Sequence, residues 1–105
     1  MEDRVIEYLR GHGWQIIDRH VTTRHGEIDI LALDGDMVVA VEVKARRSNK
    51  YGAAVESITP RKMERLIAAF QTVLADRGWS DRRIRMDLVA IDPTGVKHLR
   101  GIGQF

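Results

Sequence analysis

Residues 26–52 read GEIDILALDGDMVVAVEVKARRSNKYG, with an apolar run on either side of Asp34-Gly35. The β-branched and alternating residues of 26–33 and 37–45 predict two strands. Asp-Gly is the dipeptide that a two-residue type I′ turn prefers, so we expect the strands to form a hairpin. Charged side chains interrupt both apolar runs, and such charges are costly unless something compensates them.

The hairpin pattern predicts which side chains share a face. A turn flanked by Leu33 and Asp36 puts Glu27 opposite Glu42. Asp29 then faces Ala40 and lies diagonal to Glu42, roughly 7–8 Å away, within reach of one shared ion. Because side chains alternate, one face is mixed and the other is wholly apolar and should pack against a helix. The mixed face carries Glu27, Asp29, Leu31, Val38, Ala40, Glu42 and Lys44; the apolar face carries Ile28, Ile30, Val39, Val41 and Val43.

A divalent cation would relieve the repulsion between the carboxylates of this mixed face. Mg²⁺ or Mn²⁺ suits it, since hard cations take one or two carboxylates together with water and phosphate oxygens. The alternative is a solvated strand face with a cross-strand ion pair, which is common in antiparallel sheets.

The rest of the chain predicts the order α-β-β-β-α-β with a short terminal strand. Thr59 suits the N-cap of the second helix, Pro60 its first position and Gly78 its C-terminal cap. We therefore expect an α/β fold, a mixed sheet flanked by helices, as one domain over residues 1–105. The other predicted elements are a helix over 2–10 and strands over 14–21, 84–91 and 96–99, with a basic loop over 46–57.

Composition narrows the class of protein. The 105 residues hold 17 Lys and Arg against 15 Asp and Glu, a net charge of only +2 that does not by itself identify a nucleic-acid binder. There is no cysteine, which excludes disulfides and thiolate metal sites and fits a reducing cytoplasm. No apolar run approaches the ~20 residues of a membrane span. The charged N-terminus is unlike a signal peptide, and no glycine-rich phosphate loop predicts nucleotide binding.

The spacing Asp-x12-Glu-x-Lys on neighbouring strands resembles the PD-(D/E)xK core of restriction-endonuclease-like nucleases. The match is closer still to the small YraN-like family, which is related to archaeal Holliday junction resolvases. Together the GEID and VEVK-x-R blocks are specific, and the resemblance covers nearly the whole chain. The matching motifs are Glu2-x-x-Val5-x-x-Tyr8-Leu9, Gly13-Trp14, GEIDIL at 26–31, VEVKAR at 41–46, Tyr51-Gly52, Lys62 and Arg85-Met86-Asp87.

The resemblance implies a role for each residue of the acidic cluster. Asp29 and Glu42 would bind Mg²⁺ or Mn²⁺ with help from the Val43 carbonyl. Lys44 would orient or activate the attacking water, and Glu2 would complete the cluster from the first helix. The implied activity is hydrolysis of nucleic-acid phosphodiesters, with DNA as the expected substrate. Analogy with the resolvases implies a homodimer.

Basic side chains beside this cluster predict contacts with nucleic acid. Arg46, Arg47 and Lys50 directly follow the lysine of the motif and would contact phosphates, while Tyr51 would stack on a sugar or base. The alternative is a solvated loop. Lys62 stands in the first turn of the second helix, where an anion is preferred, and this misfit favours a phosphate-facing role.

The remaining polar residues have structural interpretations. Glu27 is either a supporting group of the cluster or an edge residue paired with Arg24 or Lys44. Arg85 and Asp87 predict an ion pair that braces the site from the fourth strand. The histidines show no metal-ligand spacing and are expected at the surface: His12, His20, His25 and His98.

Two other classes of function stay open. The first is a non-catalytic nucleic-acid-binding module that retains the nuclease fold, which would bind DNA in a salt-sensitive way without metal dependence. The second is a protein-interaction domain with affinity for neither metal nor DNA.

Overall fold

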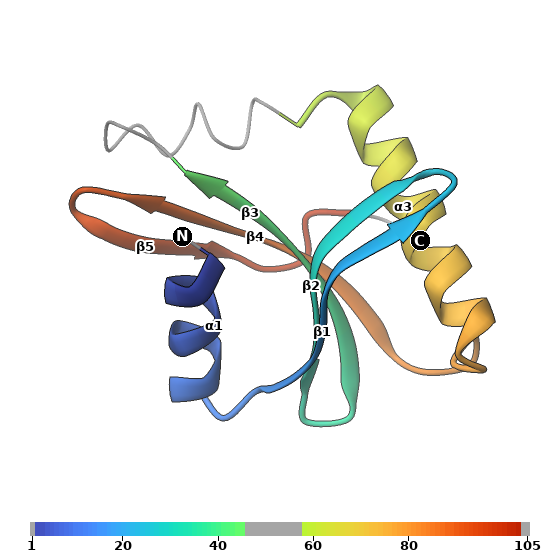
Figure 1. Ribbon diagram of the computed structural model, residues 1–105, viewed down its shortest axis with the longest axis horizontal. Helices are drawn as coiled ribbons and strands as arrows, with labels where there is room; N and C mark the ends of the chain where they lie inside the picture. The colour runs from blue at the N-terminus through green and yellow to red at the C-terminus, as the bar shows by residue number, and fades with distance from the viewer. Residues whose placement is uncertain (1, 46–57, 104–105) are drawn as a thin grey trace.

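The computed structural model describes residues 2–45 and 58–103 and has a five-stranded sheet between two helices (Figure 1). The strand order is β1-β2-β3-β4-β5, with β3 and β4 parallel and the other pairs antiparallel. This confirms the expected mixed α/β class and element order; the predicted 46–57 loop lies outside the described residues. The elements are α1 (Glu2–Gly11), β1 (Gln15–Thr23), β2 (Gly26–Asp34), β3 (Met37–Ala45), α3 (Pro60–Asp76), β4 (Ile84–Asp92) and β5 (Gly95–Leu99).

The two helices cover opposite faces of the sheet, one at each side of the view in Figure 1. Both faces are therefore apolar over most of their area, as a sheet buried on both sides requires. Among the described residues, no helix is long and apolar enough to cross a membrane. The α1 side buries Val5, Leu9, Trp14, Ile30, Val39, Val41 and Val89, and the α3 side buries Leu31, Val38, Ala40, Phe70, Val73 and Met86.

Helix α3 begins and ends where the sequence predicts. The Thr59 hydroxyl accepts a hydrogen bond from the Lys62 N–H (3.1 Å) and Pro60 is the first helical residue. Gly78, with φ of 72°, follows the last turn in the left-handed conformation that glycine tolerates best. The helix lies in the crossover between the parallel strands β3 and β4, a connection that parallel pairing demands. This crossover brings its first turns toward the carboxyl end of β3.

The two-residue turn between β2 and β3 lies one residue later in the chain than predicted. Asp34 pairs with Met37, so the turn residues are Gly35 and Asp36. Gly35 has φ of 64° whereas Asp36 does not have a positive φ, which fits a type II′ turn rather than type I′. The predicted register was therefore wrong by two residues. A shift of two does not by itself move any side chain to the other face, because the side-chain period of a strand is two.

Face assignment fails at one predicted position. Ile28 packs with the α3 cluster, although it was expected beside Ile30, which packs with the α1 cluster. The alternation of β2 thus reverses at Asp29. On the neighbouring strand, His20 has a left-handed backbone (φ 54°) at the same level, between Arg19, which pairs with Ile30, and Val21, which pairs with Ile28. The two irregularities therefore coincide.

Candidate active site

Asp29 and Glu42 lie where β2 and β3 separate. The last regular pair of this ladder is Ile30 with Val41, and the two strands diverge beyond it (Figure 1). The Val43 N–H donates to Asp29 Oδ2 (2.9 Å). A backbone donor of β3 thus fixes the Asp29 carboxylate. The expected pairings of Asp29 with Ala40 and of Glu27 with Glu42 were wrong, because the register shift and the divergence of the strands remove them.

Burial makes both carboxylates hard to ionise. Burial raises the pKa of Asp29; the Val43 hydrogen bond opposes this rise, and the nearby charges of Glu2 and Glu27 add to it. Burial and the charge of Asp29 raise the pKa of Glu42, against the opposing effect of two lysines. Glu42 is only 8% exposed. A further cation between these carboxylates would favour their ionised forms.

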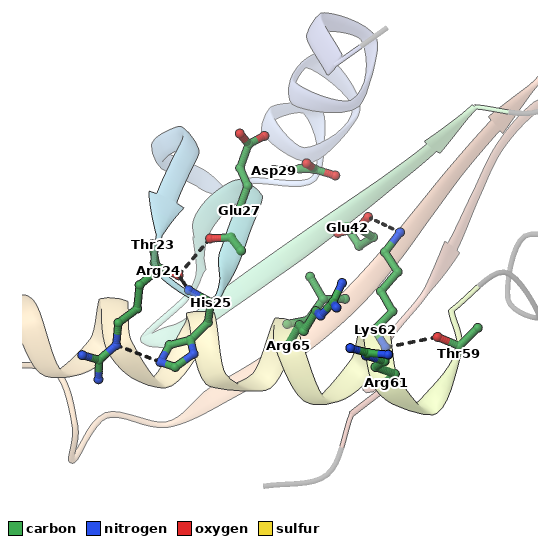
Figure 2. Close-up of a pocket in the computed structure, with 12 residues that line it drawn as sticks. Thr23, Arg24, His25, Glu27, Asp29, Glu42, Thr59, Arg61, Lys62 and Arg65 are labelled. Carbon is green, nitrogen blue, oxygen red and sulfur yellow. Dashed lines mark hydrogen bonds and ion pairs between the residues drawn. The ribbon is translucent and has the colours of Figure 1, made fainter.

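Two lysines from different elements approach Glu42. Lys44 Nζ lies 3.8 Å from Glu42 Oε1, and Lys62 Nζ lies 3.4 Å from the same oxygen. Figure 2 shows the Lys62 side chain reaching from α3 to the strand. A hydrogen bond with Lys62 and then burial lower the pKa of Lys44. The structure thus joins Lys62 to the acidic cluster.

Glu2 lies on the α1 side of the same centre. A cavity of about 530 Å³ is lined by Glu2, Asp29, Glu42 and Val43, among others. The structure therefore brings the carboxylate from the first helix into the neighbourhood that the sequence predicts. Glu2 also forms an ion pair with Arg19 (3.4 Å).

His20 connects two carboxylates of the site, a contact that the sequence did not predict. Its Nε2 lies 2.6 Å from Glu2 Oε1 and its Nδ1 lies 2.9 Å from Glu27 Oε1. The Glu27 hydrogen bond and the Glu2 charge raise the pKa of His20. Because each ring nitrogen faces a carboxylate, the doubly protonated ring satisfies both contacts. Glu27 therefore pairs with His20 and not with Arg24 or Lys44, as the alternative interpretation had it; its supporting role in the cluster stays a prediction.

His98 is buried, and its expected place at the surface was wrong. Its side chain is only 6% exposed, and its Nε2 lies 2.7 Å from Asp87 Oδ2. Arg85 Nε donates to Asp87 Oδ1 (2.8 Å), which confirms the predicted Arg85–Asp87 ion pair. The hydroxyl oxygen of Tyr8, on α1, lies 3.0 Å from Nδ1 of His98. This network links α1, β4 and β5.

The larger cavity at the site lies on the α3 side and measures about 810 Å³. Asp29 and Glu42 line it together with residues from two other segments (Figure 2). The β1–β2 turn contributes Arg24 and His25, and α3 contributes Arg61, Lys62 and Arg65. The presence of Arg24 in the lining of this cavity was not predicted, because only the folded β1–β2 hairpin brings it there; its guanidinium group is directed toward His25 (Figure 2).

The donor set fits a hard divalent cation. Within residues 2–45 and 58–103, no three His, Cys, Asp or Glu side chains converge as a complete metal site. Asp29 and Glu42 supply two carboxylates, which suffices for Mg²⁺ or Mn²⁺ but falls short of the three or four protein ligands of a zinc site. The N–H of Val43 is engaged by Asp29; a role for its carbonyl stays a prediction. The predicted phosphate contacts Arg46, Arg47, Lys50 and Tyr51 lie outside the described residues.

The fold and the site together define a mixed α/β protein that carries a carboxylate–lysine centre where two strands diverge. The profile described as Uncharacterised protein family UPF0102 matches residues 1–91. A UPF0102 protein of Persephonella marina is 36% identical over 99 residues, which cover 94% of this chain and 85% of the relative. A UPF0102 protein of Stutzerimonas stutzeri is 40% identical over 95 residues, covering 90% and 79%. The chain belongs to the UPF0102 family, which is the YraN-like family.

Proposed function

We propose that this UPF0102 protein is a Mg²⁺- or Mn²⁺-dependent nuclease that hydrolyses nucleic-acid phosphodiesters, with DNA as the expected substrate. The observation that carries the proposal is the pairing of a buried carboxylate, Glu42, and a half-buried one, Asp29, with two lysines beside Glu42. The Asp-x12-Glu-x-Lys spacing, which resembles the PD-(D/E)xK nucleases, supports the same assignment.

Asp29 and Glu42 would hold the metal, with the Val43 carbonyl as an expected further ligand. When bound, the ion supplies the Lewis acidity that polarises a phosphodiester and makes water a stronger acid. The Val43 N–H keeps the Asp29 carboxylate in place during binding. Glu2, on the α1 side of the centre, would support the cluster through the adjoining cavity.

Lys44 would orient the attacking water and accept its proton. The lowered pKa of Lys44 makes its neutral form more accessible than that of an ordinary lysine. Lys62 would keep its charge and stabilise the negative charge that develops on the phosphate oxygens. Two adjacent lysines can thus divide the proton-accepting and charge-stabilising roles.

Cleavage assays with matched variants test this proposal. Asp29→Asn keeps an oxygen that can accept the Val43 N–H but weakens metal binding, and Lys44→Ala removes the amine. Each should lower cleavage of branched, single-stranded or duplex DNA in Mn²⁺ by about 10²–10³-fold, while circular dichroism shows an intact fold. Asp81→Asn, at an exposed site, is the control and should cut like wild type. Wild-type cleavage rates for either site variant in Mn²⁺ would refute the mechanism.

The second candidate function is a nucleic-acid-binding module without catalysis. It is favoured by the cationic side chains around the larger cavity, which need no metal to attract a polyanion. It predicts that DNA binding survives Asp29→Asn, is insensitive to EDTA, and occurs without cleavage in Mn²⁺.

A further inference from the structure

Three arginines around the larger cavity have no acidic partner among the residues that the structure describes. We name Arg24, Arg61 and Arg65 the arginine rim; all three are exposed and line the cavity that holds Asp29 and Glu42. Within the part of the chain that the structure describes, none of the three forms an ion pair with a carboxylate, and Arg24 donates only to the ring of His25 (3.2 Å). Five other arginines pair with carboxylates, namely Arg19, Arg77, Arg83, Arg85 and Arg100. Among the described residues Arg4, Arg10 and Arg82 also form no such ion pair, but they lie outside this cavity, so the rim is distinguished by its position.

The rim reaches the cavity from two separate elements. Arg24 comes from the turn between β1 and β2, while Arg61 and Arg65 come from the first turns of α3 (Figure 2). The cavity lining holds four Arg or Lys side chains and three Asp or Glu side chains. A metal ion alone would satisfy the carboxylates and leave the guanidinium groups unpaired. A ligand that satisfies both must carry several negative charges spaced along its length.

We infer that the arginine rim binds the phosphates of a nucleic-acid strand on both sides of the acidic centre. The strand would cross between the β1–β2 turn and α3, with one phosphate at Asp29 and Glu42 and its neighbours at the guanidinium groups. Arginine presents a planar fork of donors that matches phosphate oxygens. This inference rests on the proposed function for the central phosphate but assigns separate residues to substrate binding.

Binding in EDTA isolates the rim from catalysis. We would measure the affinity of labelled single-stranded and duplex oligonucleotides by fluorescence anisotropy over a series of salt concentrations. Arg24→Ala should weaken binding about five- to tenfold and reduce the slope of log K against log salt by about 0.7–0.9, the value for one lost phosphate contact. Arg61→Ala with Arg65→Ala should reduce the slope by about twice as much.

Matched controls remove the same charge elsewhere. Arg10→Ala is compared with Arg24→Ala, and Arg10→Ala with Arg83→Ala is compared with the double variant; both control sites are exposed and lie outside the cavity. If the rim variants bind like their controls, the rim is refuted. The rim is also refuted if polyglutamate of equal charge competes as well as the oligonucleotide, because these arginines would then bind any polyanion.

Cleavage in Mn²⁺ separates this inference from the proposed function. If the wild type cuts, the rim variants should raise KM about five- to tenfold with little change in kcat, since their contacts lie away from the reacting atoms. If the wild type does not cut but the rim variants lose binding in EDTA, hydrolysis fails and the rim stands. If the wild type cuts and the rim variants match their controls, hydrolysis stands and the rim fails.

Discussion

His20 combines a strained backbone with two contacts at the site. Among the described non-glycine residues it alone has a positive φ, 54°, a conformation that most side chains disfavour. Its ring lies against Glu2 and Glu27, so the acidic helix end and β2 both depend on it. The strain coincides with the reversal of side-chain alternation at Asp29. We interpret His20 as a positioning residue for the carboxylates.

Two substitutions separate the backbone role of His20 from its side-chain role. His20→Gly relieves the strain and removes both carboxylate contacts, while His20→Ala removes the contacts and keeps the strain. We expect the Tm to fall in the order wild type, His20→Gly, His20→Ala, with several degrees between the extremes. Thermal unfolding at pH 7 followed by circular dichroism measures this. An Ala variant more stable than the Gly variant would show that the left-handed conformation carries no cost.

At this scale the sequence predicts the residues with a strong spacing signal. Asp29, Glu42 and Lys44 are found because charges inside apolar strands are rare and their spacing is specific. The role of His20 is missed because the local sequence pattern does not indicate a left-handed backbone at a non-glycine residue. His98 is missed because its burial depends on Asp87, which lies on another strand.

A few polar contacts fix how the helices and strands are arranged. The cap at Thr59 fixes the start of α3, and the crossover to β4 carries Lys62 to Glu42. On the other side of the sheet, Asp87 accepts hydrogen bonds from Arg85, from the Gly101 N–H and, through the charge-assisted contact, from His98. The cap could be predicted from the sequence. The register of the β2–β3 hairpin could not, because Asp34-Gly35 and Gly35-Asp36 are both acceptable turns.

Asp87 should be a major source of stability for the β4–β5 end of the sheet. Its side chain is fully buried, so Asp87→Ala would remove the acceptor of Arg85 Nε, His98 Nε2 and the Gly101 N–H, and would leave Arg85 with Asp34 as its remaining carboxylate partner (3.1 Å). We expect the free energy of unfolding to fall by about 3–5 kcal/mol. Asp81→Ala, at an exposed position, should change it by at most about 0.5 kcal/mol. Urea unfolding at pH 7 makes the comparison, and equal effects of the two substitutions would contradict this role.

The same carboxylate predicts a dependence on pH. Burial raises the pKa of Asp87, but hydrogen bonds from His98, Arg85 and the Gly101 N–H outweigh it, so the pKa lies below its usual value. A depressed pKa contributes stability above the ordinary carboxyl range that is lost as the pH falls through the lowered pKa. Wild type should therefore lose stability more steeply with acid than Asp87→Asn does. If wild type and Asp87→Asn lost stability equally steeply as the pH falls, this contribution of Asp87 would be ruled out.

The whole molecule gathers charges that the sequence keeps far apart. Arg24 and Arg65 come from segments on opposite sides of the hairpin in sequence, and both line one cavity with Asp29. The α/β class follows from periodicity, since each apolar stripe must find a partner. The arginine rim cannot be predicted from periodicity, because it depends on how a turn and a helix meet across the sheet.

The metal-free molecule should be destabilised by its own site. The raised pKa of Asp29 means that its ionisation costs more in the folded state, so stability falls as the pH rises from the ordinary carboxyl range through the raised pKa. In EDTA at pH 7, Asp29→Asn should therefore raise the Tm by several degrees, and the gain should vanish below the ordinary carboxyl pKa. Differential scanning calorimetry at both pH values measures it. An unchanged or lower Tm at pH 7 would mean that other groups already neutralise Asp29.

The proposed chemistry depends first of all on a divalent-cation site formed by Asp29 and Glu42, and calorimetric titration of Mn²⁺ into the metal-free protein is the decisive experiment. Wild type and Asp81→Asn should each bind one ion per carboxylate pair, with binding weakened at least about tenfold in Asp29→Asn and in Glu42→Gln. Equal Mn²⁺ affinity in wild type and Asp29→Asn, or no binding by wild type, would contradict the existence of this site.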